Sequence, residues 1–143
     1  MVDPAGAREH LLGERRAFVE GVLACADRVA ADWDGDGTTD RTVVVDPFAS
    51  LLERSGLLEA LPTLLAECVQ QAGATLSAPP VAAPPYVVVT SEGVVLRATL
   101  DGERLVVTLR AFDVDRSGER PRYVRGPRDP ESAVEVALRG RSR

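Results

Sequence analysis

The segment 94–109 restricts the fold more than any other part of the sequence, because its two halves are rich in β-branched residues and alternate in polarity. Asp101-Gly102 separates the halves, and this dipeptide favours a two-residue type I′ hairpin turn. Such a turn places Leu100 opposite Glu103 and fixes the register of the other pairs. Six apolar side chains then share one face of the hairpin: Val94, Leu96, Ala98, Leu105, Val107 and Leu109. A shift by one residue would turn arginines toward the core, so this register is strongly specified.

Further strands are predicted on both sides of this hairpin. The run YVVVTS (86–91) precedes it and is β-branched. Near the C-terminus, Val134, Val136 and Leu138 alternate as a strand does, although Asp129-Pro130 also resembles the start of a helix. We favour a turn followed by a fourth strand. An antiparallel meander with one apolar face requires a second layer that covers this face.

The N-terminal half supplies that layer as helices. Apolar residues at helical spacing predict one long amphipathic helix over 6–32. Asp46-Pro47 suits the start of a second helix that ends at Gly56, while the residues 43–45 fit either an extended entry or an earlier helical turn. A third helix is predicted from Pro62 to Gln71, with Gly73 after its end.

These elements predict an α+β fold, in which about three N-terminal helices pack on one face of a C-terminal antiparallel sheet of three to four strands. We expect residues 1–143 to form a single domain, since 143 residues suit one hydrophobic core. Its parts are a helical half (6–73), a proline-rich connector (74–85), a β-meander half (86–139) and a frayed tail (140–143).

The composition indicates a particular kind of host. The chain has no Lys, Asn or Ile, and all 17 basic residues are Arg. The three absent residues have AT-rich codons, so we expect a GC-rich genome. A net charge of −5 fits a salt-adapted proteome, and a GC-rich actinobacterium is the alternative source. With no apolar run long enough for a membrane span and no signal peptide, the predicted location is the cytoplasm, away from membranes.

The charges are distributed unevenly, and this bears on partners. Residues 110–143 carry 9 Arg against 6 acidic residues, whereas residues 1–109 carry 8 Arg against 16. The C-terminal arginines alternate with acidic side chains, which favours a solvated, internally paired segment. We therefore expect no nucleic-acid binding.

No catalytic constellation is recognisable in the sequence. GxSxG, Walker A, GxGxxG and HExxH motifs are absent, and His10 is the only histidine, near an N-terminus that we expect to be frayed. Cys25 and Cys68 lie on apolar helix faces, which predicts buried free thiols. Asp113 and Asp115 share one side of a strand end, where solvated carboxylates are expected without any pocket to perturb them.

The acidic segment DWDGDGTTDR (32–41) is the best candidate for a metal site. Its oxygen ligands match the first nine positions of an EF-hand loop, with Gly37 at the sixth position. The candidate ligands for Ca²⁺ or Mg²⁺ are Asp32, Asp34, Asp36 and Asp40, together with the Thr38 carbonyl. Position twelve, where a bidentate Glu completes the shell, is Val43. We favour the alternative of a structural Asp/Gly turn between two helices.

Four stretches of the chain resemble a family of small uncharacterised haloarchaeal proteins. They are DRTVVVDPF (40–48), VAAPPYVVVTS (81–91), VLRATLDGERLVV (95–107) and YVRGP (123–127). The resemblance covers most of the chain. It implies a halophilic archaeal cytoplasm and a domain of unknown function, and it brings no catalytic residues.

The function hypothesis is therefore a small cytoplasmic binding or interaction module that is not an enzyme and needs no cofactor. Its expected partner is an unknown protein or a second copy of the chain, bound through the sheet. The alternative hypothesis is a divalent-metal-binding protein, with or without hydrolytic activity, that uses the acidic loop 32–40.

Overall fold

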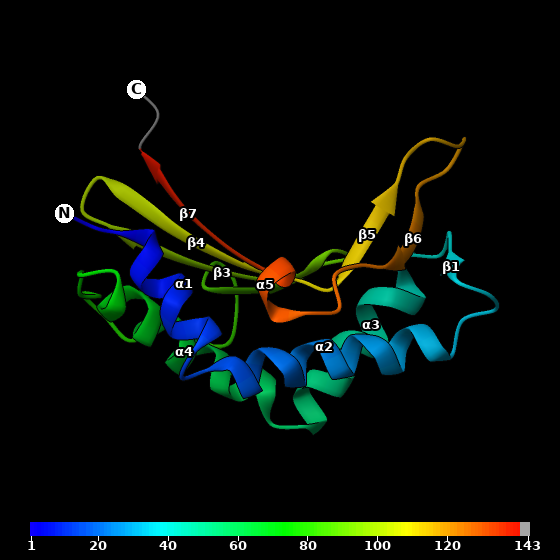
Figure 1. Ribbon diagram of the computed structural model, residues 1–143, viewed down its shortest axis with the longest axis horizontal. Coiled ribbons are helices and arrows are strands. Elements are labelled where there is room, and N and C mark those ends of the chain that lie inside the picture. Colours follow the sequence, from blue (N-terminus) through cyan, green and yellow to red (C-terminus); the bar gives the residue numbers. More distant parts are fainter. Residues whose placement is uncertain (141–143) are drawn as a thin grey trace.

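A computed structural model describes residues 1–140, and the predicted frayed tail lies outside the described residues except for Gly140. Helices α1–α4 lie along one side of the strands, and the other side of the strands is open (Figure 1). The helices are α1 (Pro4–Leu12), α2 (Arg16–Ala31), α3 (Thr42–Arg54), α4 (Leu57–Gln71) and α5 (Pro130–Ala133). The strands are β1 (Gly37–Thr38), β2 (Val87–Val89), β3 (Gly93–Leu100), β4 (Glu103–Arg110), β5 (Phe112–Asp115), β6 (Arg122–Arg125) and β7 (Val134–Gly140). The α+β class is confirmed.

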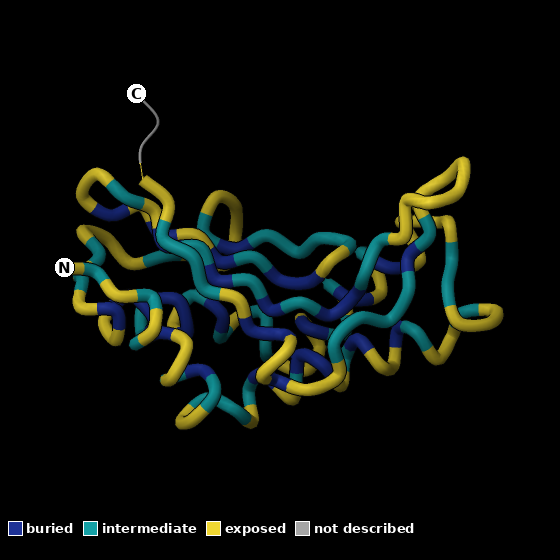
Figure 2. Tube along the Cα trace, turned by 45° about the horizontal axis from the view of Figure 1, so that its top comes forward, coloured by how far each residue is buried: buried dark blue, intermediate teal, exposed yellow. Residues whose placement is uncertain are grey.

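The main sheet has the predicted hairpin at its centre. Its strand order is β2-β3-β4-β7, with every neighbouring pair antiparallel. Leu100 pairs with Glu103 and Val94 with Leu109, so the predicted hairpin register is confirmed along its whole length. The six apolar residues of the predicted inner face are all fully buried. Figure 2 shows buried residues along the strands and exposed ones at the turns.

The fourth strand is also confirmed, and the turn before it is a single helical turn. Asp129 caps α5, because its Oδ2 accepts the backbone N–H of Ser132 at 3.0 Å. The chain then extends into β7, which pairs with β4 at the edge of the sheet. The helix-start pattern at Asp129-Pro130 and the strand alternation after it therefore both describe real elements, which follow one another along the chain.

The single helix predicted over 6–32 is wrong, because the chain turns between α1 and α2. The Gly13 N–H donates to the Glu9 carbonyl at 2.9 Å and ends α1. The two helices differ in their main neighbours: α1 packs mostly against α4 and β7, whereas α2 packs mostly against α3. His10, expected near a frayed end, has a side chain that is only 7% exposed. The apolar periodicity continues across Gly13 and therefore hid this break.

Two predicted helix starts are too late in the sequence. Residues 43–45 form the first turn of α3, which resolves that alternative, so Asp46 is not an N-cap and Pro47 lies inside the helix. Proline has no N–H to donate to the carbonyl four residues earlier. At α3 that carbonyl belongs to Val43, and it accepts the Trp33 indole N–H at 3.3 Å. Likewise α4 begins at Leu57, not at the predicted Pro62.

The sequence did not predict a second sheet. It has three short strands in the order β1-β6-β5, and its β1 lies within the acidic loop. Phe112 at the start of β5 packs edge-on against Phe48, with ring centroids 5.1 Å apart, and lies 5.9 Å from Trp33. This aromatic contact joins the second sheet to the common core. Of the two cysteines, Cys68 is buried as predicted, but Cys25 is only half-buried.

Candidate interaction surface

The structure places the four predicted metal ligands along an exposed loop. Asp32 caps the C-terminus of α2, and the chain turns at Gly35, whose φ is +84°. Asp36 accepts a hydrogen bond from Arg122 Nη2 at 2.6 Å, and this guanidinium lowers the pKa of the Asp36 carboxyl. Asp40 accepts the Thr42 hydroxyl at 2.6 Å, and this contact lowers its pKa as well. Two of the four carboxylates therefore have protein partners.

The geometry of this loop differs from that of an EF-hand. Gly37, at the position of the sharp turn, is part of β1 and pairs with Val124 of β6. A Cβ at Gly37 would lie 2.7 Å from the Arg122 guanidinium, which is the flexible end of a partly exposed side chain. Within residues 1–140, no three His, Cys, Asp or Glu side chains are grouped as metal ligands. Binding of Ca²⁺ or Mg²⁺ at these residues remains the alternative hypothesis.

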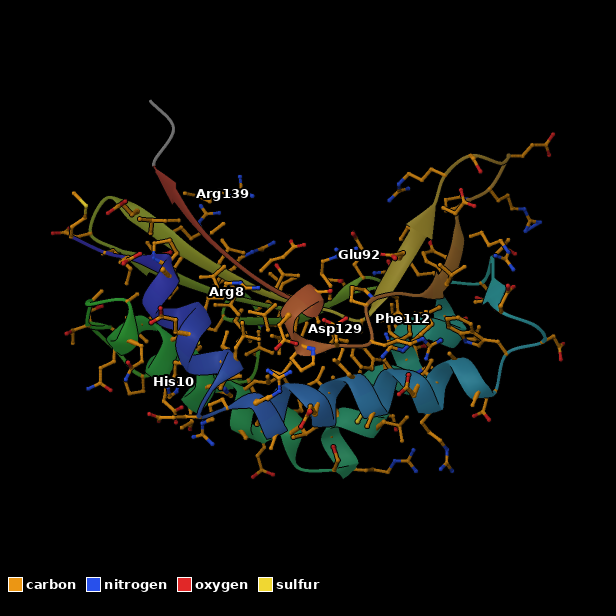
Figure 3. The ribbon with its side chains drawn as sticks, viewed as in Figure 1. Arg8, His10, Glu92, Phe112, Asp129 and Arg139 are labelled. Carbon is orange, nitrogen blue, oxygen red and sulfur yellow. The ribbon has the colours of Figure 1, made fainter. Side chains whose placement is uncertain are left out.

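The open side of the main sheet offers a larger surface. We define the outer face as the side chains of β3, β4 and β7 that point away from the helices. Its members are Val95, Arg97, Thr99, Arg104, Val106, Thr108, Arg110, Glu135, Ala137 and Arg139. Figure 3 shows Arg139 on this side of the sheet, opposite the helices. A hollow of about 400 Å³ lies at the Arg139 end of the outer face, and Glu103 lines it together with Arg97, Arg104 and Arg139.

The four arginines of the outer face differ in their partners. Arg110 contacts both Asp113 and Glu135, with 3.3 Å between its Nη1 and the Glu135 carboxylate. Among residues 1–140, no carboxylate lies within 4.0 Å of the guanidinium of Arg97, Arg104 or Arg139. All three of these side chains are exposed. The outer face is thus cationic at the end near the β3–β4 turn and neutralised at the other end.

The register makes this cationic end unusual. Arg104 and Arg139 are direct cross-strand partners in the pairing of β4 with β7. Like charges at such positions repel one another and destabilise the pair. Thr99 lies on the other side of Arg104, so no acidic neighbour in the row offsets this repulsion. An anionic group placed between the two guanidiniums would relieve it.

The sequence identified only part of this surface. The hairpin register placed Arg97 and Arg104 on the solvated face of the sheet. Arg139 was missed as a member, because the partner and register of the last strand were not predicted. The alternation of residues 134–138 was the available signal, since it places Arg139 on the same side as Glu135.

One arginine elsewhere has a structural role that the sequence did not reveal. Arg125 of β6 has a side chain that is only 4% exposed. Its Nη1 donates to the carbonyls of Ala111, at 2.5 Å, and Pro127, at 2.7 Å. Its Nη2 donates to the Leu23 carbonyl at 3.1 Å, and its Nε to the Asp27 carboxylate at 2.9 Å. Burial lowers the pKa of this guanidinium. Arg125 thus connects the second sheet to α2.

A second structural cluster holds the turn between α1 and α2 against α4. Glu67 of α4 accepts hydrogen bonds from Arg15, whose Nε lies 2.7 Å away, and contacts His10 Nε2 at 2.7 Å. The Arg15 guanidinium is the main cause that lowers the pKa of Glu67 to about 2. Glu67 thus joins both sides of the α1–α2 turn to α4.

The fold and this surface define a small α+β domain with one open, arginine-bearing sheet face. The chain belongs to the DUF7988 family, described as a domain of unknown function, whose model matches residues 5–139. This match confirms the predicted membership of an uncharacterised family. Neither the curated proteins nor the solved structures gave a match. Within residues 1–140, no helix combines the length and apolar character that a bilayer crossing requires.

Proposed function

We propose that this protein is a small, non-enzymatic interaction module of a salt-adapted, haloarchaeal cytoplasm. In this proposal, the cationic end of the outer face binds an acidic segment of a protein partner. The observation that carries the proposal is the cluster of Arg97, Arg104 and Arg139, exposed and without a carboxylate partner among residues 1–140. The arginine-only basic composition and the net charge of −5 support the proposed host.

Charge complementarity favours an acidic partner. The chain is acidic as a whole, so an exposed cationic cluster is a local exception to its surface charge. Guanidiniums bind carboxylates in bidentate geometry, and the neighbouring Val106 and Ala137 offer apolar contact to a peptide backbone. Such a contact is sensitive to salt, and it contributes to specificity and association rate more than to affinity.

The test uses a fluorescein-labelled poly-L-glutamate peptide and fluorescence anisotropy at about 0.1 M salt, where surface charges act over roughly 10 Å. The variant Arg97→Gln/Arg104→Gln is expected to bind on the order of tenfold more weakly than wild type. The matched control is Arg28→Gln/Arg54→Gln, which removes the same charge from exposed positions on the helical side. Equal loss in both variants, or no binding by wild type, would refute the proposed site.

A further inference from the structure

The two edges of the main sheet are protected unequally. The edge strand β2 has only three residues and follows the proline-rich connector, which limits pairing with another strand. The opposite edge, β7, has seven residues and no proline or glycine before Gly140. Within residues 1–140, no group outside β4 hydrogen-bonds the backbone of residues 135–140. A long open edge of this kind is a template for a further strand.

The hairpin turn determines which groups this edge presents. In a two-residue hairpin, the backbones of the residues that flank the turn, here Leu100 and Glu103, hydrogen-bond to each other. Because the direction of backbone N–H and C=O groups alternates along a strand, the odd-numbered residues of β4 hydrogen-bond to β3 and the even-numbered residues to β7. The β7 partners of those even-numbered residues are Glu135, Ala137 and Arg139. The N–H and C=O groups of Val136 and Leu138 therefore point to the free edge. Consistent with this parity, the Val134 N–H points away from β4 and donates to the Pro130 carbonyl.

This parity restricts how β7 pairs antiparallel with a second β7. Hydrogen bonds between the two strands form only where residues whose backbone N–H and C=O groups point to the free edge lie opposite each other. These are the even-numbered residues, so the numbers of opposed residues add up to an even number. The two-fold axis that relates the copies therefore passes through a residue and not between two residues. An axis at Ala137 places Val136 opposite Leu138 of the second copy and Glu135 opposite its Arg139. An axis at Val136 leaves both charges without an opposite partner. An axis at Leu138 places Arg139 opposite Ala137 and Glu135 opposite a position beyond the described residues. Axes at Glu135 or Arg139 bring like charges together, which destabilises the pair.

Three observations favour the register centred on Ala137. Arg139 has no carboxylate partner among residues 1–140, and the second copy's Glu135, which also contacts Arg110 of its own copy, supplies one. The Glu135–Arg139 pairs fall at non-hydrogen-bonded positions, where side chains approach most closely. Val136 and Leu138 face the core but are only half-buried, whereas their β4 partners Val107 and Leu105 are fully buried. A second copy would cover this remaining apolar edge.

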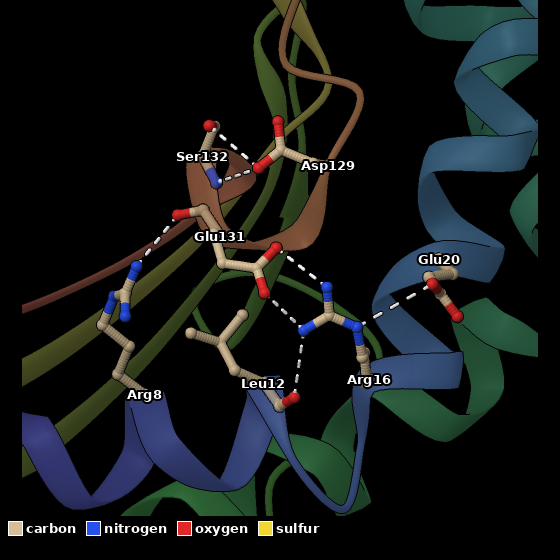
Figure 4. Close-up of polar contacts among 7 residues, drawn as sticks. All are labelled: Arg8, Leu12, Arg16, Glu20, Asp129, Glu131 and Ser132. Atoms are coloured by element: carbon tan, nitrogen blue, oxygen red, sulfur yellow. Dashed lines mark hydrogen bonds and ion pairs between the residues drawn. The ribbon is translucent and has the colours of Figure 1, made fainter.

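The start of β7 is held in place for such pairing. Figure 4 shows Glu131 of α5 bound by Arg16, with Nη1 2.6 Å and Nη2 2.8 Å from its two carboxylate oxygens. Arg8 of α1 donates to the Glu131 carbonyl at 2.9 Å. These contacts connect α5 to α1 and α2 immediately before the edge strand. An edge fixed in this way loses less conformational entropy on pairing than a mobile strand does.

We propose that two copies of this chain associate through their β7 strands, antiparallel and centred on Ala137, to form one continuous eight-stranded sheet. The two outer faces then lie on the same side of this sheet. Arg139 pairs with the second copy's Glu135, while Arg97 and Arg104 of both copies remain open to an acidic partner. The dimer does not depend on that partner, and its test is independent of the peptide-binding assay.

Cross-linking tests the register directly. Cα atoms at a non-hydrogen-bonded antiparallel position lie about 4.5 Å apart, within the range of a disulfide. Ala137→Cys in a Cys25→Ser background is therefore expected to form a covalent dimer with copper-phenanthroline, which accepts the two electrons released. The matched control is Val106→Cys, on the same face but one strand inward. Cross-linking of both variants to the same extent, or of neither, would overturn the register.

Charge exchange tests the same contact without a new covalent bond. In sedimentation equilibrium at about 0.1 M salt, Arg139→Glu is expected to weaken the dimer on the order of 10- to 100-fold, because two attractive pairs become repulsive. The double variant Glu135→Arg/Arg139→Glu restores opposite charges and is expected to restore dimerisation. Circular dichroism shows whether each variant is folded. A wild-type monomer at all concentrations, or a double variant no tighter than Arg139→Glu, would exclude this dimer.

Discussion

Replacing Arg125 with methionine is expected to destabilise the protein strongly. The substitution keeps the unbranched apolar part of the side chain and removes the guanidinium with every hydrogen bond it makes. The carbonyls of Ala111 and Pro127, which lie 2.5 and 2.7 Å from Nη1, then lose a charged donor in a site where only 4% of the arginine side chain is exposed. The Ala111 carbonyl keeps one bond, because it also accepts the Gly126 N–H at 2.9 Å.

The magnitude follows from these contacts. A hydrogen bond to a charged group contributes about 1.5–3 kcal/mol, and an acceptor left buried without a donor costs about 1–3 kcal/mol. The ion pair with Asp27 adds little, because that carboxylate is 54% exposed and well solvated. We therefore expect the free energy of unfolding to fall by about 3 kcal/mol. For a domain of this size, such a loss lowers Tm by roughly 10 °C.

The matched control for this substitution is Arg128→Met. Arg128 Nη1 donates to the same Asp27 Oδ1 at 3.0 Å, but its side chain is 70% exposed. Its loss is expected to change stability by less than about 0.5 kcal/mol. Urea unfolding followed by circular dichroism gives both values. If the two variants lost equal stability, the shared ion pair and not the buried carbonyl contacts would be responsible, and the reasoning would be refuted.

Three further predictions concern the acidic and aromatic groups. Folding lowers the pKa of Glu67 from 4.5 to about 2, so its stabilisation is present above about pH 4.5 and is lost as the pH falls toward 2. In acid-unfolding curves, Glu67→Gln should flatten this decline, while Glu59→Gln, an exposed carboxyl on the same helix, should not. Millimolar CaCl₂ or MgCl₂ should release no heat in calorimetry, because Arg122 and Thr42 already engage Asp36 and Asp40; heat that disappears in Asp34→Ala would instead support the metal hypothesis. Trp33→Phe removes the donor to the carbonyl that Pro47 leaves free, and denaturant unfolding should show a loss of about 1 kcal/mol.

Local signals explain which parts of the fold the sequence predicted. The hairpin register depends on Asp101-Gly102 and on side chains a few residues away, so it follows from the sequence alone. The second sheet depends on the pairing of Gly37 with Val124, between a two-residue strand and a segment far along the chain. The bend at Gly13 lies between His10 and Arg15, which both contact Glu67 of α4. Neither of these long-range contacts leaves a periodic pattern in the sequence.

Apart from His10, every basic side chain of this protein is an arginine. Residue type alone therefore does not distinguish arginines with a structural role from arginines that bind a partner. Burial, partners and clustering on one sheet face together separate them. Arg125 is enclosed and bonds to four acceptors, and Arg110 is balanced by Glu135 on its own face and by Asp113 of β5. Arg97 and Arg104 are exposed and have no carboxylate partner within residues 1–140. An acidic chain that keeps Arg104 and Arg139 as a repulsive cross-strand pair loses stability there, and a ligand or second copy that supplies carboxylates would offset that loss.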